Sequence, residues 1–163
     1  MDRIILYDSE TTNSSIFGSI IEFGAVVVDK NLKELDKLSI RGRIPEGEVP
    51  SAKALLVNST SVDLLTKGNY SHYEFMRAIE EFFLKYTPSL IMGWHNTNFD
   101  RRMLHYNFFR NNRYPYITHV SPNQEHDGLH IARAAQTLNP ETLKTELTEA
   151  GNPSLALESL SRM

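Results

Sequence analysis

The chain has 163 residues, of which 40% are hydrophobic and 23% charged, and its formal net charge at pH 7 is −3. These values predict one globular domain and exclude a polybasic nucleic-acid-binding protein, so any contact with nucleic acid must be local. The absence of cysteine excludes disulfide frameworks, thiolate zinc sites and cysteine nucleophiles. We find neither a signal-peptide pattern nor an apolar run of membrane-spanning length, and therefore expect a cytoplasmic protein.

The first quarter of the chain predicts an antiparallel meander of three strands. Residues 4–6 form an apolar run that leads into two acids, and residues 20–29 are rich in β-branched side chains. Residues 29–31 predict a hairpin turn, after which a more polar strand resumes over residues 35–44.

The remainder predicts helices with one further strand between them. Ser71 and Glu74 form a capping box, which marks the start of a helix that Pro88 ends. Residues 90–94 are apolar and predict a short buried strand. The other predicted helices cover residues 51–57, 61–68, 100–111, 127–138, a short stretch from 140, and 155–160. A meander followed by alternating strands and helices predicts an α/β fold with a mixed sheet, in which sites form beyond strand ends.

Asp8 and Glu10 lie at the end of the first strand. Positions two apart on a strand point to the same face, so these two carboxylates should lie side by side. Like charges held this close repel each other unless a cation lies between them, which favours a divalent metal site. Solvated acids at an ordinary strand exit are the alternative.

Asp100 is the third acid of interest, because it follows the buried strand and begins a predicted helix. The positive end of the helix favours a carboxylate at this position. Helix capping alone would also explain an aspartate there.

Three blocks in this order, residues 8–12, 21–25 and 93–100, resemble the DEDD superfamily of 3′–5′ exonucleases, which has an RNase H-like fold. Within that superfamily the chain is most similar to the bacterial exonuclease I family. Further stretches follow that family's pattern: 55–68, 108–116, 126–129 and 153–160.

The resemblance implies a metal-dependent nuclease that hydrolyses single-stranded DNA from its 3′ end, with a role in DNA repair or recombination. Asp8, Glu10 and Asp100 match three of the family's four metal-binding acids, and hard carboxylate oxygens suit Mg²⁺ or Mn²⁺. One metal activates a water and the second stabilises the leaving oxygen, about 4 Å away. Glu10 is expected to bridge towards the side of the nucleophile.

Two departures from the family pattern bear on activity. The fourth acid, and the His or Tyr that orients the water, would follow residue 160 in a further helix. We therefore expect a domain over residues 1–163 that lacks its last helix and motif, with low turnover by itself and possible self-association through an exposed apolar patch. His126 and His130 are interpreted as surface or capping residues. Ser9 replaces an often aromatic residue between the two acids, and we expect it to affect packing only.

Substrate contacts are expected from Thr11, beside the acids, and from a basic segment that begins with Arg101 and Arg102. Aromatic residues alternate with the basic ones in this segment, as in proteins that hold single-stranded nucleic acid by charge and stacking. A solvated helix face with Phe108 and Phe109 in the core is the alternative. Trp94 and Phe99 are expected to pack near the site.

Two other functions stay open at this point. A catalytically inactive domain of the same fold could bind nucleic acid or a protein partner, and the missing fourth acid favours it. A ribonuclease of the same superfamily is also compatible with these residues, because discrimination of DNA from RNA depends on contacts at the sugar 2′ position.

Overall fold

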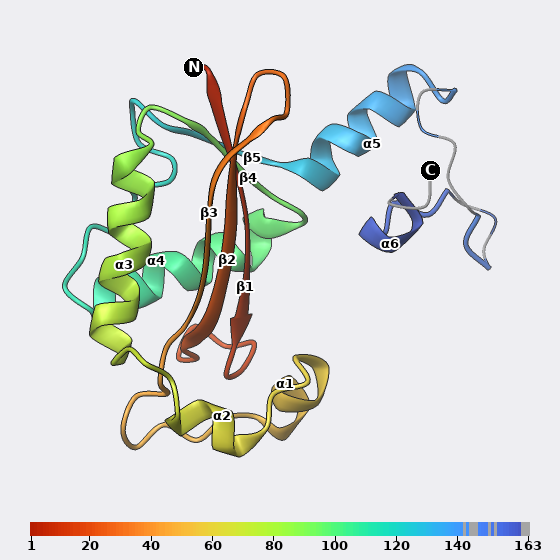
Figure 1. Ribbon diagram of the computed structural model, residues 1–163. Helices are drawn as coiled ribbons and strands as arrows, with labels where there is room; N and C mark the ends of the chain where they lie inside the picture. The colour runs from red at the N-terminus through yellow and green to blue at the C-terminus, as the bar shows by residue number, and fades with distance from the viewer. Residues whose placement is uncertain (142, 144–146, 150, 152, 161–163) are drawn as a thin grey trace.

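The computed structural model describes residues 1–141, 143, 147–149, 151 and 153–160. Its centre is a five-stranded sheet in the order β3-β2-β1-β4-β5. Strands β1 (Arg3–Thr11), β2 (Ile20–Asp29) and β3 (Glu34–Arg41) pair antiparallel. Strands β4 (Leu90–Gly93) and β5 (Gln124–Asp127) pair parallel, with β4 beside β1. The predicted α/β fold with a mixed sheet is confirmed (Figure 1).

Two strand predictions need correction. Strand β5 was not predicted, because its four residues are polar and it lies at the edge of the sheet, where little of it is buried. Strand β3 ends at Arg41 rather than at residue 44. Gly42 N still donates to Ile21 O of β2, but Arg43 N donates to Tyr70 O and Ile44 N donates to Leu65 O, so the backbone leaves the β2 ladder after Gly42.

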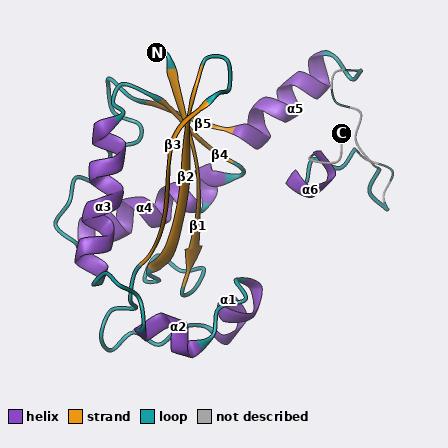
Figure 2. Cartoon of the chain, viewed as in Figure 1, coloured by secondary structure: helices purple, strands orange, loops and turns teal. Residues whose placement is uncertain are grey.

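The helices agree with prediction to within a few residues (Figure 2). The capping box is present, as Ser71 Oγ accepts from Glu74 N and Glu74 Oε2 accepts from Ser71 N. The helical elements are α1 (Ala52–Val57), α2 (Val62–Thr66), α3 (His72–Lys85), the 3₁₀ turn η1 (Asn96–Asn98), α4 (Asp100–Arg110), α5 (Gly128–Leu138) and α6 (Leu157–Leu160).

The predicted starts of α1, α2 and α4 are confirmed in position. Ser51 and Ser61 are the N-cap residues of α1 and α2, although neither side chain makes a capping hydrogen bond. Residues 96–98 form a separate 3₁₀ turn before α4. The last helix begins at Leu157, two residues later than predicted. The short helix predicted from residue 140 lies mostly outside the described residues.

Helices α3 and α4 both cover one face of the sheet, as Figure 1 shows. The buried side chains of this face join the two helices in one core, which includes Ile5, Tyr7, Phe23, Phe83, Ile91, Leu104 and Phe108. On the opposite face Leu6 is 43% exposed, so the centre of the sheet is open there. Phe109 is 72% exposed, which corrects its predicted place in the core. In the part of the chain that is described, no helix has the length and apolar character to cross a membrane.

Candidate metal and nucleic-acid site

The side chains of β1 alternate between the two faces of the sheet, and this alternation places the first two acids. Ile5, Tyr7 and Ser9 are buried on the helix-covered face. Asp8 is exposed and Glu10 half-buried on the open face, as predicted for positions two apart on one strand. A pair of carboxylates therefore projects from the end of the central strand.

Glu10 lies in a local concentration of negative charge. Partial burial raises its pKa, and the neighbouring carboxylates of Asp8, Glu22 and Asp100 raise it further. Glu22 is the register partner of Glu10 on β2, and Arg41 neutralises it through an ion pair of 2.6 Å between Nη2 and Oε2. Glu10 and Asp8 have no such ion pair among the described residues, so a cation at this strand end would be stabilised.

Asp100 is the first residue of α4, and its side chain approaches the site from the helix-covered face. Only 7% of the residue is exposed, and Ser9 Oγ donates a 2.6 Å hydrogen bond to its Oδ1. Burial raises the pKa of Asp100 to about 6, the hydrogen bond from Ser9 opposes this rise, and the charge of Asp8 adds to it. Ser9 thus makes a polar contact with a candidate ligand, which corrects the expectation that it affects packing only.

The three predicted acids lie at one end of the sheet, but their ligand atoms do not form a single group of three. Asp100 and Asp8 are close enough to shift a pKa, as are Asp100 and Glu10. In the described part of the chain, three ligand atoms from different residues lie within 4.8 Å of one another only at His105, His119 and Glu125. The metal-binding role of Asp8, Glu10 and Asp100 therefore stays a prediction.

Asp127 holds the loop between β4 and α4, which positions Asp100. Its carboxylate accepts hydrogen bonds from the backbone amides of His95, Thr97 and Leu129, at 3.0, 3.1 and 3.0 Å. Burial acts to raise the pKa of Asp127, but these hydrogen bonds outweigh it and the pKa is lowered. No local pattern in the sequence indicates that this residue both caps α5 and accepts hydrogen bonds from the loop that follows β4. His126 and His130 beside it are exposed, as expected.

A cavity of about 300 Å³ lies beside the carboxylate pair. Its walls come from the end of β1, the turn after it, α1 and the start of α4, and they include Ser9, Glu10, Thr11, Asn58 and Phe99. Thr11 Oγ1 donates to Asn13 O at 3.0 Å, and Asn58 Nδ2 donates to Thr11 O at 2.9 Å. Thr11 and Phe99 therefore line the same cavity as Glu10.

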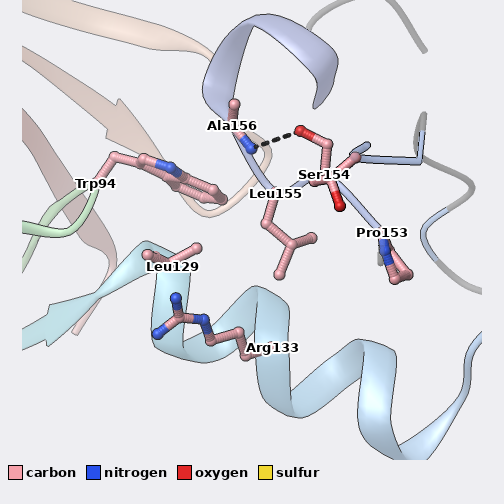
Figure 3. A pocket seen from close by; sticks show the side chains of 8 residues that line it. Trp94, Leu129, Arg133, Pro153, Ser154, Leu155 and Ala156 are labelled. Atoms are coloured by element: carbon pink, nitrogen blue, oxygen red, sulfur yellow. Dashed lines mark hydrogen bonds between the residues drawn. The ribbon is translucent and has the colours of Figure 1, made fainter. Parts of the chain in front are cut away.

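A second cavity, of about 430 Å³, is separate from the acids (Figure 3). Trp94 forms one wall, Leu129 and Arg133 of α5 form another, and residues 153–156 close it. Trp94 and Phe99 were expected to pack near the site. Phe99 agrees with this expectation, because it lines the cavity beside Glu10, whereas Trp94 lines the second cavity, which contains none of the three acids.

The basic segment divides into two groups with different surroundings. Arg110 donates to the backbone oxygens of Phe17 and Gly18, at 2.8 and 2.6 Å, and Arg113 forms a 2.9 Å ion pair with Glu80. These two arginines stabilise the fold. Arg101 and Arg102, in the first turn of α4 beside Asp100, have no ion-pair partner within the described residues, and so are the ones available to a ligand.

No protein-family model matches the chain. It is 25% identical to exodeoxyribonuclease I of Buchnera aphidicola subsp. Schizaphis graminum over 163 residues, which are 98% of this chain and 34% of that protein. It is 29% identical to the Haemophilus influenzae exodeoxyribonuclease I over 115 residues, which are 70% of this chain and 24% of that protein. The chain thus spans about a third of the length, or less, of these curated relatives.

Solved structures of exonuclease I share the fold of this chain. The E. coli exonuclease I complex with a dT13 oligonucleotide superimposes with a TM-score of 0.90 at 22% identity, over 99% of this chain and 35% of that one. A product-bound exonuclease I structure superimposes with a TM-score of 0.89, also at 22% identity, over 99% of this chain and 38% of that one. The resemblance to the bacterial exonuclease I family is thereby confirmed over nearly the whole chain, and the chain has the fold of the matching part of exonuclease I.

Proposed function

We propose that the chain carries metal-binding carboxylates of a 3′–5′ exonuclease that hydrolyses phosphodiester bonds in single-stranded DNA. The observation that carries this proposal is the placement of Asp8, Glu10 and Asp100 at one end of the sheet, around the ends of the neighbouring parallel strands β1 and β4. Relatives named exodeoxyribonuclease I, and the solved complex of exonuclease I with an oligonucleotide, support the reaction and the substrate class.

The residues fit Mg²⁺ or Mn²⁺. Asp8 and Glu10 offer hard oxygen ligands on the open face, where burial first, and then the neighbouring carboxylates, raise the pKa of Glu10. When bound, such ions activate a water and stabilise the leaving oxygen. The chain's own contribution is to hold Asp8 and Glu10 on a rigid central strand, and Asp100 at the start of α4 through Ser9.

The surroundings of the acids suit the 3′ end of a strand. The cavity beside Glu10 accepts the terminal nucleoside against Phe99, because aromatic faces stack on any base. Arg101 and Arg102 belong to the same helical turn as Asp100 and would supply positive charge for the next phosphates. Binding through stacking and phosphate contacts is independent of base sequence, as expected for an exonuclease that acts on single strands.

Metal binding and strand cleavage test the proposal together. We would measure Mn²⁺ binding by electron paramagnetic resonance and follow a 3′-labelled single strand with Mg²⁺ or Mn²⁺, comparing the original chain with Asp8→Ala. Asp2→Ala is the matched control, because Asp2 is an exposed acid outside the site. We expect Asp8→Ala to remove both Mn²⁺ binding and metal-stimulated cleavage, while Asp2→Ala changes neither. Binding and cleavage that survive Asp8→Ala would exclude the proposal.

An inactive domain that binds nucleic acid is the second candidate. It is supported by the arrangement of the three acids, which do not form a group of three ligand atoms that all lie within 4.8 Å of one another. This candidate predicts single-strand binding that depends on Arg101 and Arg102 but is indifferent to Asp8→Ala and to Mn²⁺. An RNA strand of the same sequence, included in each assay, distinguishes a ribonuclease from a deoxyribonuclease.

A further inference from the structure

The described residues contain a second group of potential metal-ligand side chains. His105 comes from α4, His119 from the loop after that helix, and Glu125 from β5. One potential ligand atom from each lies within 4.8 Å of the other two. Tetrahedral Zn²⁺, with bonds of about 2.0–2.1 Å, needs ligand atoms about 3.3 Å apart, so small rotations of the side chains suffice.

Glu125 is a buried carboxylate without a strong counter-charge. Its side chain is 2% exposed, and no Lys or Arg of the described chain lies within ion-pair distance of it. Tyr7 Oη donates to Oε1 at 2.8 Å, Asn96 Nδ2 donates to Oε1 at 3.2 Å, and Thr118 Oγ1 donates to Oε2 at 2.8 Å. These donors fix the carboxylate in place but leave its negative charge uncompensated.

Both imidazoles have a ring nitrogen that could bind a cation. The Nε2 atom of His105 is buried and has no hydrogen-bond partner, which is costly for a polar atom and leaves it free to act as a ligand. His119 Nδ1 lies 3.8 Å from Glu125 Oε2, on the exposed side of the group. A metal would therefore reach the site past His119.

Tyr116 keeps both imidazole rings in orientation. Its ring lies 5.5 Å from each, edge to face, while the two imidazoles are 4.8 Å apart at a tilt of 33°. Packed rings supported by hydrogen-bonded neighbours are the usual surroundings of a metal site.

We propose that His105, His119 and Glu125 form a site for Zn²⁺ or a similar first-row divalent ion, distinct from the carboxylate pair at Asp8 and Glu10. Two imidazoles, which are borderline ligands, beside one hard carboxylate favour Zn²⁺ over Mg²⁺, and three protein ligands leave a fourth position for water. The ion would attach the loop that follows α4 both to that helix and to β5. The site is independent of the proposed nuclease function, because it shares no residue with it.

Co²⁺ absorption and Zn²⁺ calorimetry on the chelator-treated full chain test the site. Tetrahedral Co²⁺ bound to imidazole gives strong visible absorption, which we expect at one equivalent and which Zn²⁺ should remove by displacement. His119→Ala should weaken Zn²⁺ binding by at least about tenfold. The exposure of His119 makes this variant compatible with folding, and circular dichroism verifies that it is folded. His126→Ala is the matched control, because His126 is an exposed histidine on the same strand as Glu125.

Three results would overturn the site: no Zn²⁺ binding by the original chain, binding that is unchanged in folded His119→Ala, or an equal loss in His126→Ala. Asp8→Ala separates the two proposals. Zn²⁺ affinity should stay unchanged in that variant, whereas Mn²⁺ binding at the carboxylate pair should be lost.

Discussion

Ser9 Oγ donates a 2.6 Å hydrogen bond to Asp100 Oδ1, and this bond joins the central strand to the first turn of α4. Ser9 belongs to the face of β1 that the helices cover, whereas Asp8 and Glu10 beside it belong to the open face. The bond lowers the pKa of Asp100 against the effect of burial. One strand therefore presents two candidate ligands directly and supports the third through the residue between them.

Replacing Ser9 by Ala should raise the pKa of Asp100 above its value of about 6, because a carboxylate buried beside Asp8 would lose its side-chain donor. A hydrogen bond to a charged group contributes about 1.5–3 kcal/mol, so Mn²⁺ affinity near pH 6 should fall by about tenfold. Titration of the Asp100 carboxyl by NMR measures the first effect. Ser9→Thr keeps the hydroxyl and is the control, and an unchanged pKa in Ser9→Ala would contradict the expectation.

Stability without divalent ions should depend on pH through Asp100. The folded-state pKa of about 6 is above the ordinary value of 3.8, so between these values the folded chain binds more protons than the unfolded chain. Stability from this group is thus greatest at low pH and is lost as the pH rises through 6. The shift corresponds to at most about 3 kcal/mol at pH 7.

The Asp100→Asn variant isolates the contribution of the Asp100 carboxyl to the pH dependence of stability. In chelator, we expect urea unfolding to show that the variant is more stable than the original chain at pH 7, with the difference disappearing towards about pH 4. Asp2→Asn changes an exposed carboxyl and serves as the control. Parallel pH profiles for Asp100→Asn and the original chain would show that Asp100 is not destabilised by its surroundings.

Local patterns predict much of this fold, because the spacing of hydrophobic residues and the capping of helices both depend on residues that are close in the sequence. The β-branched run of β2, the capping box at Ser71 and the same-face placement of Asp8 and Glu10 all follow from neighbouring residues. Strand β5 does not, because its polar residues pair with β4 through backbone atoms that carry no sequence signal.

The contacts that organise the site are long-range, and the sequence does not indicate them. Ser9 meets Asp100 across 91 positions, and Tyr7 meets Glu125 across 118. The sequence places Asp127 in a stretch that follows the family pattern, but it does not indicate what this residue contacts. Its hydrogen bond to the amide of His95 depends on β5 lying beside β4. Side-chain partners of this kind become visible only when the topology is known.

The two groups of arginines should respond differently to substitution. Arg113→Met breaks a half-buried ion pair with Glu80 and should cost about 3 kcal/mol of stability without a specific effect on single-strand affinity. Arg102→Met should leave stability within about 0.5 kcal/mol and weaken single-strand binding, lowering its salt dependence by about 0.7 in the log–log slope. Fluorescence anisotropy across a salt series, with chemical unfolding in parallel, measures both. Equal loss of affinity in the two variants would contradict this division.

Gly93 is the last residue of β4 and lies where the chain turns towards Asp100. A Cβ at this position would lie 2.7 Å from Asn96 Cβ and 3.1 Å from Tyr7 O, so Gly93→Ala must displace the η1 turn. We expect a loss of about 1–3 kcal/mol, the usual range for overpacking, and weaker Mn²⁺ binding because Asp100 follows this turn.

Gly24 provides the control for that substitution. It is the register partner of Asp8 on β2, and an added Cβ there has no neighbour within 4 Å. Because glycine in a strand is less favourable than alanine by about 0.5–1 kcal/mol, Gly24→Ala should stabilise the chain slightly and leave Mn²⁺ binding intact. Thermal unfolding and Mn²⁺ titration of the two variants measure the contrast. If Gly93→Ala were as stable and bound Mn²⁺ as well as Gly24→Ala, the close approach of Asn96 and Tyr7 would not be what positions Asp100.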